Sequence, residues 1–511
     1  MSSRAAWSPA RVVLWLVGLA ACARGLAPET EPAIRVPRLW DDAALASWAT
    51  PVAGLGVPPS YPTAAEYYAA PVDNLRTYPV YHPGHEPAGY RDWIRRQGPR
   101  PIIEPEKLRT EADWIEAGRR VFEELDDPRS RTDDPMVIAH FTSAAAVDRH
   151  RDDHHDAMTR DGILLDYRWV VGRDGTLRLS FTSCAGCHTR LMPDGTVLLG
   201  APSNFDLSTA PAVESMLARL RERELSAGER FYMEFGVPWL RDDPHARFRM
   251  LPDEDVERFL AADSGEEPGT LFARFNGSPL YPTRMADLRG IRHRRYLDAT
   301  ATHQNRGPAD VARYGILVEY AETGAFGPHR LRPPASTRVG VRPPDEAMYA
   351  LALFLYSLEQ PPSPYPFDEQ ARRGREVFDG AGCADCHTPP LYTSNEVVPV
   401  DGFDPPADTD KLDVLRRRVG TDPGLALRTR KGTGYYKIPT LRGLWYRGLY
   451  EHNGSVASLE DWFDPRRLRD DYVPSGWRGH GVTHRAVPGH RFGLDLGAED
   501  KRALIAFLRT L

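Results

Sequence analysis

Two copies of one five-residue motif constrain this chain more than any other feature of its sequence. Residues 184–188 (CAGCH) and 383–387 (CADCH) both have the form Cys-x-x-Cys-His. This pattern attaches a c-type haem, because the two thiols bond to the porphyrin and the adjacent histidine ligates the iron. The predicted attachment residues are Cys184, Cys187, Cys383 and Cys386, and the predicted proximal ligands are His188 and His387. The chain is therefore expected to carry two covalently bound haem c groups.

Two other kinds of cysteine site compete with this interpretation. A structural zinc site would need two more paired ligands at short range for each motif, and none follow. A thioredoxin-like redox pair does not require the histidine and is not expected twice in one chain. The chain has five cysteines, so the two haem sites leave only Cys22 without a role.

The N-terminus has the pattern of a bacterial export signal. Arg4 and Arg11 flank the apolar residues 12–21, a run that is too short to span a bilayer but fits a signal-peptide core. It ends in residues 19–22 (LAAC), which resemble the lipobox of bacterial lipoproteins, whose cysteine is lipidated. We therefore expect a protein anchored by lipid on Cys22 and facing the periplasm or the exterior. Ordinary signal cleavage nearby is the alternative.

Composition narrows the class of protein further. A chain of 511 residues is long enough for two or three domains. The apolar content of 41% and the charged content of 27% are typical of a soluble globular protein. The net charge of −6 shows no basic excess, so a nucleic-acid partner is not expected.

An internal repeat organises the chain around the two motifs. Residues 118–122 (GRRVF) match 374–378 (GREVF), and residues 350–358 match 503–511 as apolar helical stripes. The order of opening helix, haem motif and closing helix thus occurs twice. It predicts a mainly α fold with two cytochrome c-like helical domains, long loops and insertions. The predicted parts are 1–22, a signal peptide with lipobox; 23–110, an N-terminal extension of unknown role; 111–360, the first haem domain; and 361–511, the second haem domain.

The two halves differ around their haems. Phe378 precedes Cys383 by five residues, whereas Phe122 precedes Cys184 by 62 residues, and a second long stretch follows His188. Extra polypeptide around one haem indicates a purpose-built pocket. We therefore expect any reaction to take place at the first haem.

The methionines and histidines of the second domain restrict which residue can be the second ligand of its haem iron. The last methionine, Met348, precedes the second domain, so a methionine ligand from that domain is excluded. The later histidines are His452, His480, His484 and His490. We favour His490 because it lies in a Gly-rich loop just before the closing helix, with a surface histidine as the alternative. A haem with two histidine ligands is saturated and suits electron transfer. No short distal loop follows the first motif, which favours a five-coordinate first iron.

Three segments after the second motif resemble a known family. Residues 419–423 (VGTDP), 437–443 (KIPTLRG) and 450–455 (YEHNGS) are similar to motifs of the bacterial di-haem cytochrome c peroxidase superfamily. The resemblance covers about residues 111–511 and is more specific in the second half. The superfamily includes peroxidases, enzymes that mature a tryptophan-derived quinone, and di-haem rubber oxygenases. It implies that the first haem reacts and that the second transfers electrons.

The chain departs from the peroxidase branch of this superfamily. It lacks that branch's methionine ligand to the second haem and its distal histidine soon after the first motif. The separation of 199 residues between His188 and His387 is similar to that in the rubber oxygenases. Their second haem has two histidine ligands, and the later one corresponds to His490. Superfamily members often hold Ca²⁺ between their halves, which makes it a further cofactor to consider.

Residues for the reaction itself follow mainly from this resemblance. Trp239 matches a tryptophan relay between the haems, with a core role as the alternative. His303 and Gln304 belong to a dense polar cluster at residues 300–306, which predicts proton donors to bound peroxide or dioxygen, with a hydrogen-bonded loop as an equal alternative. The peroxidase family uses a distal glutamate in the reaction. Glu234, which precedes Trp239, is the nearest candidate for it, although its flanking residues do not match the family's motif. His452 matches a histidine with a structural role near the haem.

These features predict a haem oxidoreductase with a small-molecule oxidant, either peroxide or dioxygen, and a redox-partner protein. Two other functions stay open at this point. One is a non-catalytic electron-transfer cytochrome, in which both haems would be saturated. The other is an oxygenase that cleaves a bulky apolar substrate.

Overall fold

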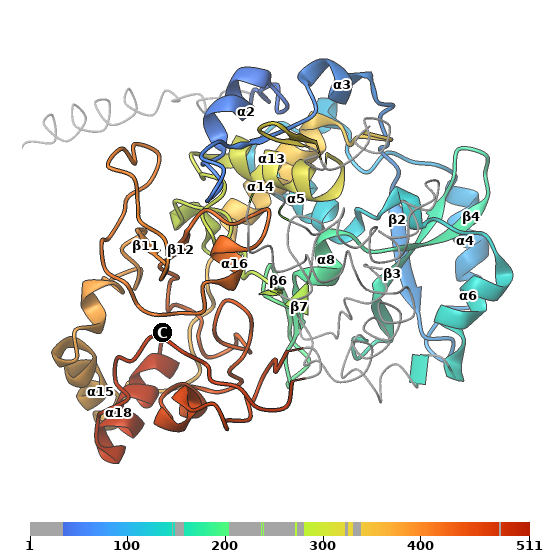
Figure 1. Cartoon of the computed structure of the whole chain (residues 1–511). Helices are drawn as coiled ribbons and strands as arrows, with labels where there is room; N and C mark the ends of the chain where they lie inside the picture. The colour runs from blue at the N-terminus through green and yellow to red at the C-terminus, as the bar shows by residue number, and fades with distance from the viewer. Residues whose placement is uncertain are drawn as a thin grey trace, which may run out of the picture.

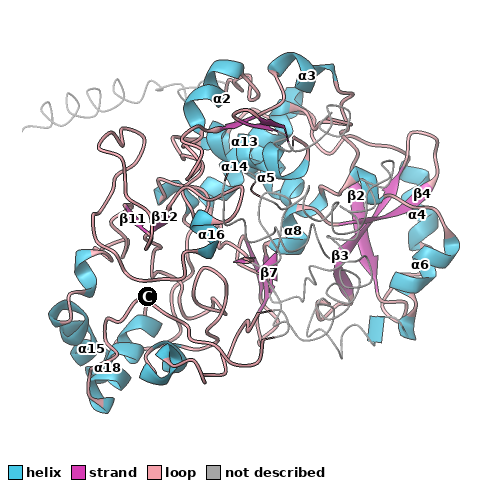
Figure 2. Cartoon of the chain, in the orientation of Figure 1, coloured by secondary structure: helices cyan, strands magenta, loops and turns pink. Residues whose placement is uncertain are grey.

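The computed structural model describes residues 34–145, 147–148, 158–203, 237, 239, 271–272, 281–321, 325–330, 339–479 and 482–511. Cys22 and Glu234 lie outside these residues. The described chain contains more helix than strand, but much of it is irregular, and it includes five small antiparallel sheets (Figure 2). The expected helical character is thus present together with sheets that the sequence pattern did not predict.

The first half is built on a close helix pair, α5 (Glu111–Glu124) and α14 (Asp345–Ser357). The helices touch at Gly118, where a Cβ atom would lie 1.9 Å from the carbonyl oxygen of Ala350. One turn further on, the rings of Phe122 and Phe354 pack with centroids 5.5 Å apart. Only glycine allows two helix backbones to approach this closely.

The second half repeats this arrangement with α15 (Glu369–Gly380) and α18 (Ala498–Arg509). A Cβ atom on Gly374 would lie 1.9 Å from the carbonyl oxygen of Ala503, and the rings of Phe378 and Phe507 are 5.4 Å apart. The predicted opening and closing helices are therefore confirmed as two equivalent pairs. The two pairs lie in different parts of the molecule (Figure 1). The domain boundaries stay predictions.

The residues before α5 pack into the first half. Trp40, Trp48 and Tyr67 are fully buried in the same apolar core as α5 and α14. The segment contributes α2 (Asp42–Trp48), β1 (Pro59–Ser60), α3 (Ala64–Ala69), β2 (Thr77–Tyr81) and α4 (Tyr90–Gln97). Strand β2 pairs with β3 (Ile163–Val171), and β1 pairs with β9 (Ala325–Phe326). The described part of the predicted extension is thus integral to the core of the first half.

Shorter elements complete the described chain. The remaining helices are α6 (Pro135–Thr142), α8 (Cys184–Cys187), α13 (Pro308–Glu319), α16 (Gly424–Leu427) and α17 (Leu459–Trp462). The remaining strands are β4 (Leu177–Phe181), β5 (Thr189–Leu191), β6 (Val197–Leu199), β7 (Leu271–Phe272), β8 (Thr283–Arg284), β10 (His329–Arg330), β11 (Val397–Pro399) and β12 (Tyr435–Lys437). Among the described helices, none combines the length and apolar character needed to cross a bilayer.

Candidate active site

Both Cys-x-x-Cys-His motifs open into one cavity of about 460 Å³. The first motif forms the single turn α8, and the second begins in a short 3₁₀ turn at Cys383–Asp385. All four motif cysteines and both motif histidines line the cavity, and none of the four thiols forms a disulfide. Both helix pairs supply apolar walls, through Phe122, Leu351, Leu355, Phe378, Leu504 and Leu508. Mostly apolar walls with a few polar groups are typical of a cofactor site.

His387 and His490 face each other inside this cavity. Their ring centroids are 6.3 Å apart, with an angle of 52° between the ring planes. A ligating imidazole nitrogen lies about 2.0–2.1 Å from a first-row metal ion and about 1.1 Å from its own ring centroid. Two imidazoles on opposite sides of one metal ion therefore have centroids a little over 6 Å apart. The observed separation fits one iron between these rings.

The His490 loop is fixed by its neighbours. His490 has a left-handed backbone (φ 43°), and its N–H donates to the carbonyl of Val419 at 2.7 Å. The buried Arg467 guanidinium donates to the carbonyls of Gly489 and His490 at 2.9 and 2.8 Å. The Trp462 ring packs on the imidazole at 5.1 Å. These contacts hold the imidazole toward His387.

Both rings are held in the form that binds metal. Burial, followed by the nearby His490, lowers the pKa of His387 to about 4, and burial lowers the pKa of His490. Neutral imidazole is the form that ligates a metal ion. Nδ1 of His387 lies 3.2 Å from the carbonyl of Tyr392, the kind of outer contact that orients a ligating ring. Nδ1 of His490 is buried without a hydrogen bond among the described residues.

His188 is oriented in a similar way in the first half. Its Nδ1 lies 2.9 Å from the carbonyl of Ala286. Helix α13 presents one face to the cavity at helical spacing, through Val311, Tyr314, Gly315 and Val318. The hydroxyl of Tyr314 lies 3.1 Å from the ammonium of Lys431, which comes from the second half. Tyr314 is thus a cavity-lining hydroxyl that sequence reasoning missed, because nothing local distinguishes it from the other tyrosines.

His303 lies behind the cavity wall. It is only 2% exposed, and its Nδ1 lies 3.0 Å from Oδ2 of Asp298, which does line the cavity. Its Nε2 lies 2.8 Å from the hydroxyl of Tyr61. Burial alone would raise the pKa of Asp298, but the hydrogen bond and charge of His303 and the charge of Lys431 lower it to about 2. His303 therefore contacts two residues of the cavity wall, Asp298 by this hydrogen bond and Tyr314 by ring packing at 5.4 Å, without lining the cavity itself.

Gln304 and Trp239, two other predicted reaction residues, contact groups that do not line the cavity. The carbonyl of Gln304 accepts from the Trp48 indole at 2.9 Å, and its side chain lies 3.5 Å from the carbonyl of Lys411. Trp239 packs against Phe326, with ring centroids 5.4 Å apart. Neither Gln304 nor Trp239 lines the cavity. The proposed roles of His303, Gln304 and Trp239 stay predictions, as does that of Glu234, which lies outside the described residues.

His452 lines the cavity but is engaged in other contacts. It stacks on Tyr436 with centroids 4.5 Å apart, and its Nδ1 lies 3.1 Å from a carboxylate oxygen of Glu451. Its carbonyl accepts from the backbone N–H of Arg284 at 2.9 Å, so it ties the two halves together. These contacts suit the structural role that the resemblance implies.

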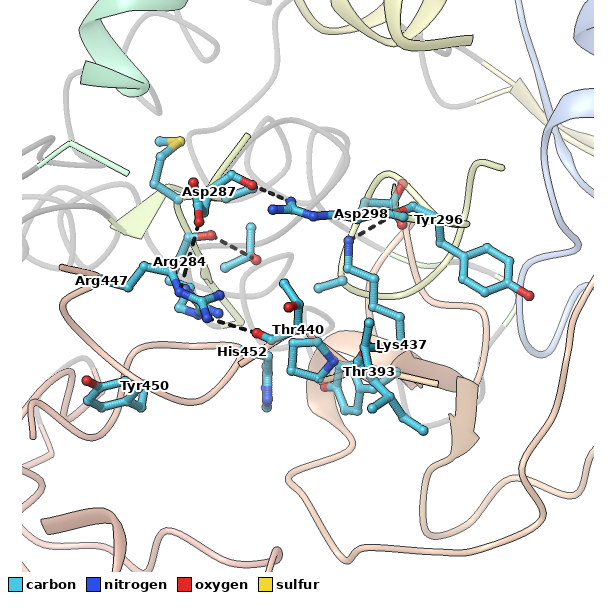
Figure 3. Close-up of a pocket in the computed structure, with 18 of the residues that line it drawn as sticks. Arg284, Asp287, Tyr296, Asp298, Thr393, Lys437, Thr440, Arg447, Tyr450 and His452 are labelled. Carbon is cyan, nitrogen blue, oxygen red and sulfur yellow. Dashed lines mark hydrogen bonds and ion pairs between the residues drawn. The ribbon is translucent and has the colours of Figure 1, made fainter. Parts of the chain in front are cut away.

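A group of basic side chains in the cavity was missed from the sequence. Arg284, Lys437 and Arg447 converge there with Asp287 (Figure 3). Arg294 lines the same cavity. Lys437 lies in a family-like segment, but its charge carried no signal among 65 lysines and arginines. Among the described residues, no cluster of three or more His, Cys, Asp or Glu side chains could hold a metal ion. The structure therefore does not locate a site for Ca²⁺.

Known proteins resemble parts of this chain. No protein-family model matches it. It is 27% identical over 200 residues to cytochrome-c peroxidase IdrP1 of Pseudomonas sp. (strain SCT), covering 33% of this chain and 49% of that protein. It is 29% identical over 142 residues to methylamine utilization protein MauG of Methylorubrum extorquens, covering 28% of this chain and 34% of MauG. The chain thus spans about half or less of the curated relatives it matches.

Solved structures resemble the chain weakly. Hydrazine synthase of Kuenenia stuttgartiensis gives a TM-score of 0.28 at 14% identity, covering 58% of this chain and 92% of that one. The di-haem peroxidase BthA of Burkholderia thailandensis gives a TM-score of 0.24 at 19% identity, covering 48% of this chain and 72% of that one. Scores this low carry no argument about function.

Proposed function

Because this chain belongs to the di-haem cytochrome c peroxidase superfamily, we propose that it is an exported haem oxidoreductase with two covalently bound haems. Peroxide or dioxygen reacts at the haem of His188, and the haem of His387 transfers electrons. The main support for this proposal is that His387 and His490 face each other in a cavity that the first motif also lines. If two histidines ligate the second iron, it has no open position, so the oxidant can bind only at the iron of the first haem.

The chain's own residues have separate tasks in this proposal. The four motif cysteines hold the porphyrins, the two motif histidines ligate the irons, and His490 caps the second. When bound, the haems supply the redox chemistry with the oxidant. The apolar helix walls exclude water from this space.

Tyr314 and Asp298 are the polar groups that we assign to the oxidant. The Tyr314 hydroxyl, next to the Lys431 ammonium, holds a proton that it can donate to an oxygen atom in the cavity. Asp298 has a pKa of about 2, so it stays ionised at neutral pH and accepts hydrogen bonds rather than donating a proton. His303 positions this carboxylate.

Export also belongs to the proposal. The signal-like residues 12–21 support it, and covalent haem attachment outside the bacterial cytoplasm agrees with it. Lipid on Cys22 would hold the protein at the membrane, within reach of a redox-partner protein. Replacing Cys22 with Ser should then release the haem protein into the soluble fraction.

Electron paramagnetic resonance of the oxidised, haem-loaded protein tests the central proposal. We expect one high-spin and one low-spin ferric signal, and two haems per chain by pyridine haemochrome assay. Oxidant consumption should then depend on an electron donor. Two low-spin ferric signals, with no cyanide binding to the oxidised protein and no carbon monoxide binding to the reduced protein, would overturn the proposal in favour of an electron-transfer cytochrome. Turnover that needs dioxygen and a hydrocarbon, without peroxide, would identify an oxygenase.

A further inference from the structure

Four basic side chains gather where the two halves meet in the cavity. Arg284 at the end of β8 comes from the first half, and Lys437 at the end of β12 and Arg447 come from the second (Figure 3). Arg294, also from the first half, lines the same cavity. Two carboxylates of the cavity act on these cations, Asp287 on the arginines and Asp298 on Lys437, and Asp287 already accepts from the Tyr446 hydroxyl at 2.8 Å. The positive charges therefore outnumber the negative ones in this part of the cavity.

Most of these cations have neutral partners. Arg447 donates to the carbonyls of Thr440 and Arg442, both at 2.8 Å, and its Nε is 4.0 Å from Asp287. The Lys437 ammonium donates to the carbonyls of Tyr296 and Leu297, both at 3.1 Å.

The guanidiniums of the first half complete the group. Arg294 donates to the carbonyls of Asp287 and Arg289. The guanidinium of Arg284 has no hydrogen bond or ion pair with the described residues. Backbone carbonyls solvate these cations but do not neutralise them.

Unbalanced charge in a protein interior is unfavourable. Burial and the neighbouring Arg447 lower the pKa of Arg284 to about 10, while burial and Arg294 lower the pKa of Lys437 to about 7. Such a group is stabilised only when anions enter it, because desolvated charges need a partner. Guanidinium groups are well suited to carboxylates, which they bind with paired hydrogen bonds.

We propose that Arg284, Arg294, Lys437 and Arg447 bind the propionate carboxylates of the two haems. This rests on the proposed function, since it needs a haem on each motif. Two haems carry four propionates, and the cations come equally from the two halves. Held by these cations, the carboxylates of both haems would lie where the two halves meet, and the ion pairs would join the halves. The same cations disfavour a divalent metal ion here.

Holoprotein variants test this assignment. Arg284→Gln and Lys437→Gln each remove one cation from the cluster, and Arg284→Lys keeps the charge. Arg292→Gln is the matched control, because Arg292 lies near Arg294 in sequence, pairs with Glu359 and does not line the cavity. Spectroelectrochemistry gives the midpoint potential of each haem, and resonance Raman spectra give the propionate bending bands.

We expect both glutamine variants to lower the potential of at least one haem and to shift a propionate band. Losing a nearby cation favours the more positive ferric state. Arg284→Lys should stay near wild type, and Arg292→Gln should match it. If Arg284→Gln does not fold, Lys437→Gln and Arg284→Lys decide the question.

Two results would overturn the assignment while leaving the proposed function intact. One is glutamine variants that load both haems and match Arg292→Gln in potentials and bands. The other is a shift of the wild-type potentials on addition of phosphate, which would mean that an external anion occupies the cluster. Failure of the wild-type chain to attach two haems would instead refute the proposed function itself.

Discussion

The imidazole rings of His387 and His490 lie 6.3 Å apart, although 102 residues separate them in the sequence. His387 belongs to the second Cys-x-x-Cys-His motif, and His490 lies on a loop fixed by Arg467 and Trp462. In the proposed function this pairing makes the two haem sites unequal, because it gives only the second iron a second histidine ligand.

Replacing His490 with Ala should therefore open the second haem. The variant should lose the low-spin ferric signal of that haem and gain a second high-spin signal, since water or nothing replaces the imidazole. Cyanide should then bind two haems per chain instead of one. His484→Ala is the control, because His484 is an exposed histidine close by. An unchanged low-spin signal in His490→Ala would mean that another residue ligates the second iron.

The close helix crossing predicts a sharp difference between two glycines of α15. Gly374→Ala places a methyl group against the carbonyl of Ala503, so it should lower the free energy of unfolding by about 1–3 kcal/mol or more. Gly380→Ala, in the same helix with no atom within 4 Å of the new Cβ, should be neutral or slightly stabilising. Denaturant titration of the holoprotein measures both. Equal effects would show that the crossing is not tight in solution.

Asp298 should give the protein an acid-sensitive stability. Its folded-state pKa of about 2 lies below the unfolded value of about 3.9, so its stabilising contribution is full above pH 4 and disappears as the pH falls to 2. This contribution is on the order of 2 kcal/mol. Asp298→Asn should remove that part of the pH dependence, as measured by denaturant titrations between pH 2 and 6. The idea fails if wild type and Asp298→Asn lose stability in parallel over this range.

Tyr314 should matter for turnover rather than for haem binding. Tyr314→Phe removes the cavity hydroxyl next to Lys431, so oxidant turnover should fall by about 10²-fold or more, the usual size of a proton-donor effect. Haem content and midpoint potentials should stay unchanged. Tyr349→Phe is the control, because Tyr349 lies in α14 and does not line the cavity. A variant as active as this control would exclude the hydroxyl as the donor.

The sequence by itself determined the features that depend on neighbouring residues. The two Cys-x-x-Cys-His motifs predict haem attachment because its thiols and histidine must lie side by side in the chain. The repeated glycine and phenylalanine of 118–122 and 374–378 predicted the opening helices, because a glycine allows close approach of a second helix and an aromatic residue one turn later can pack against it. Because no methionine follows Met348, the sequence also predicted a histidine as the second ligand, with His490 as the favoured candidate.

Only the tertiary structure decided how distant segments meet. It placed His303 behind Asp298 instead of in the cavity wall, and it joined residues 34–110 to the core of the first half. It also brought Arg284 and Arg294 to Lys437 and Arg447 across more than 140 residues. Such contacts leave no periodic trace in a sequence, because a charged or polar residue on an irregular segment looks the same whether it faces solvent or a cavity.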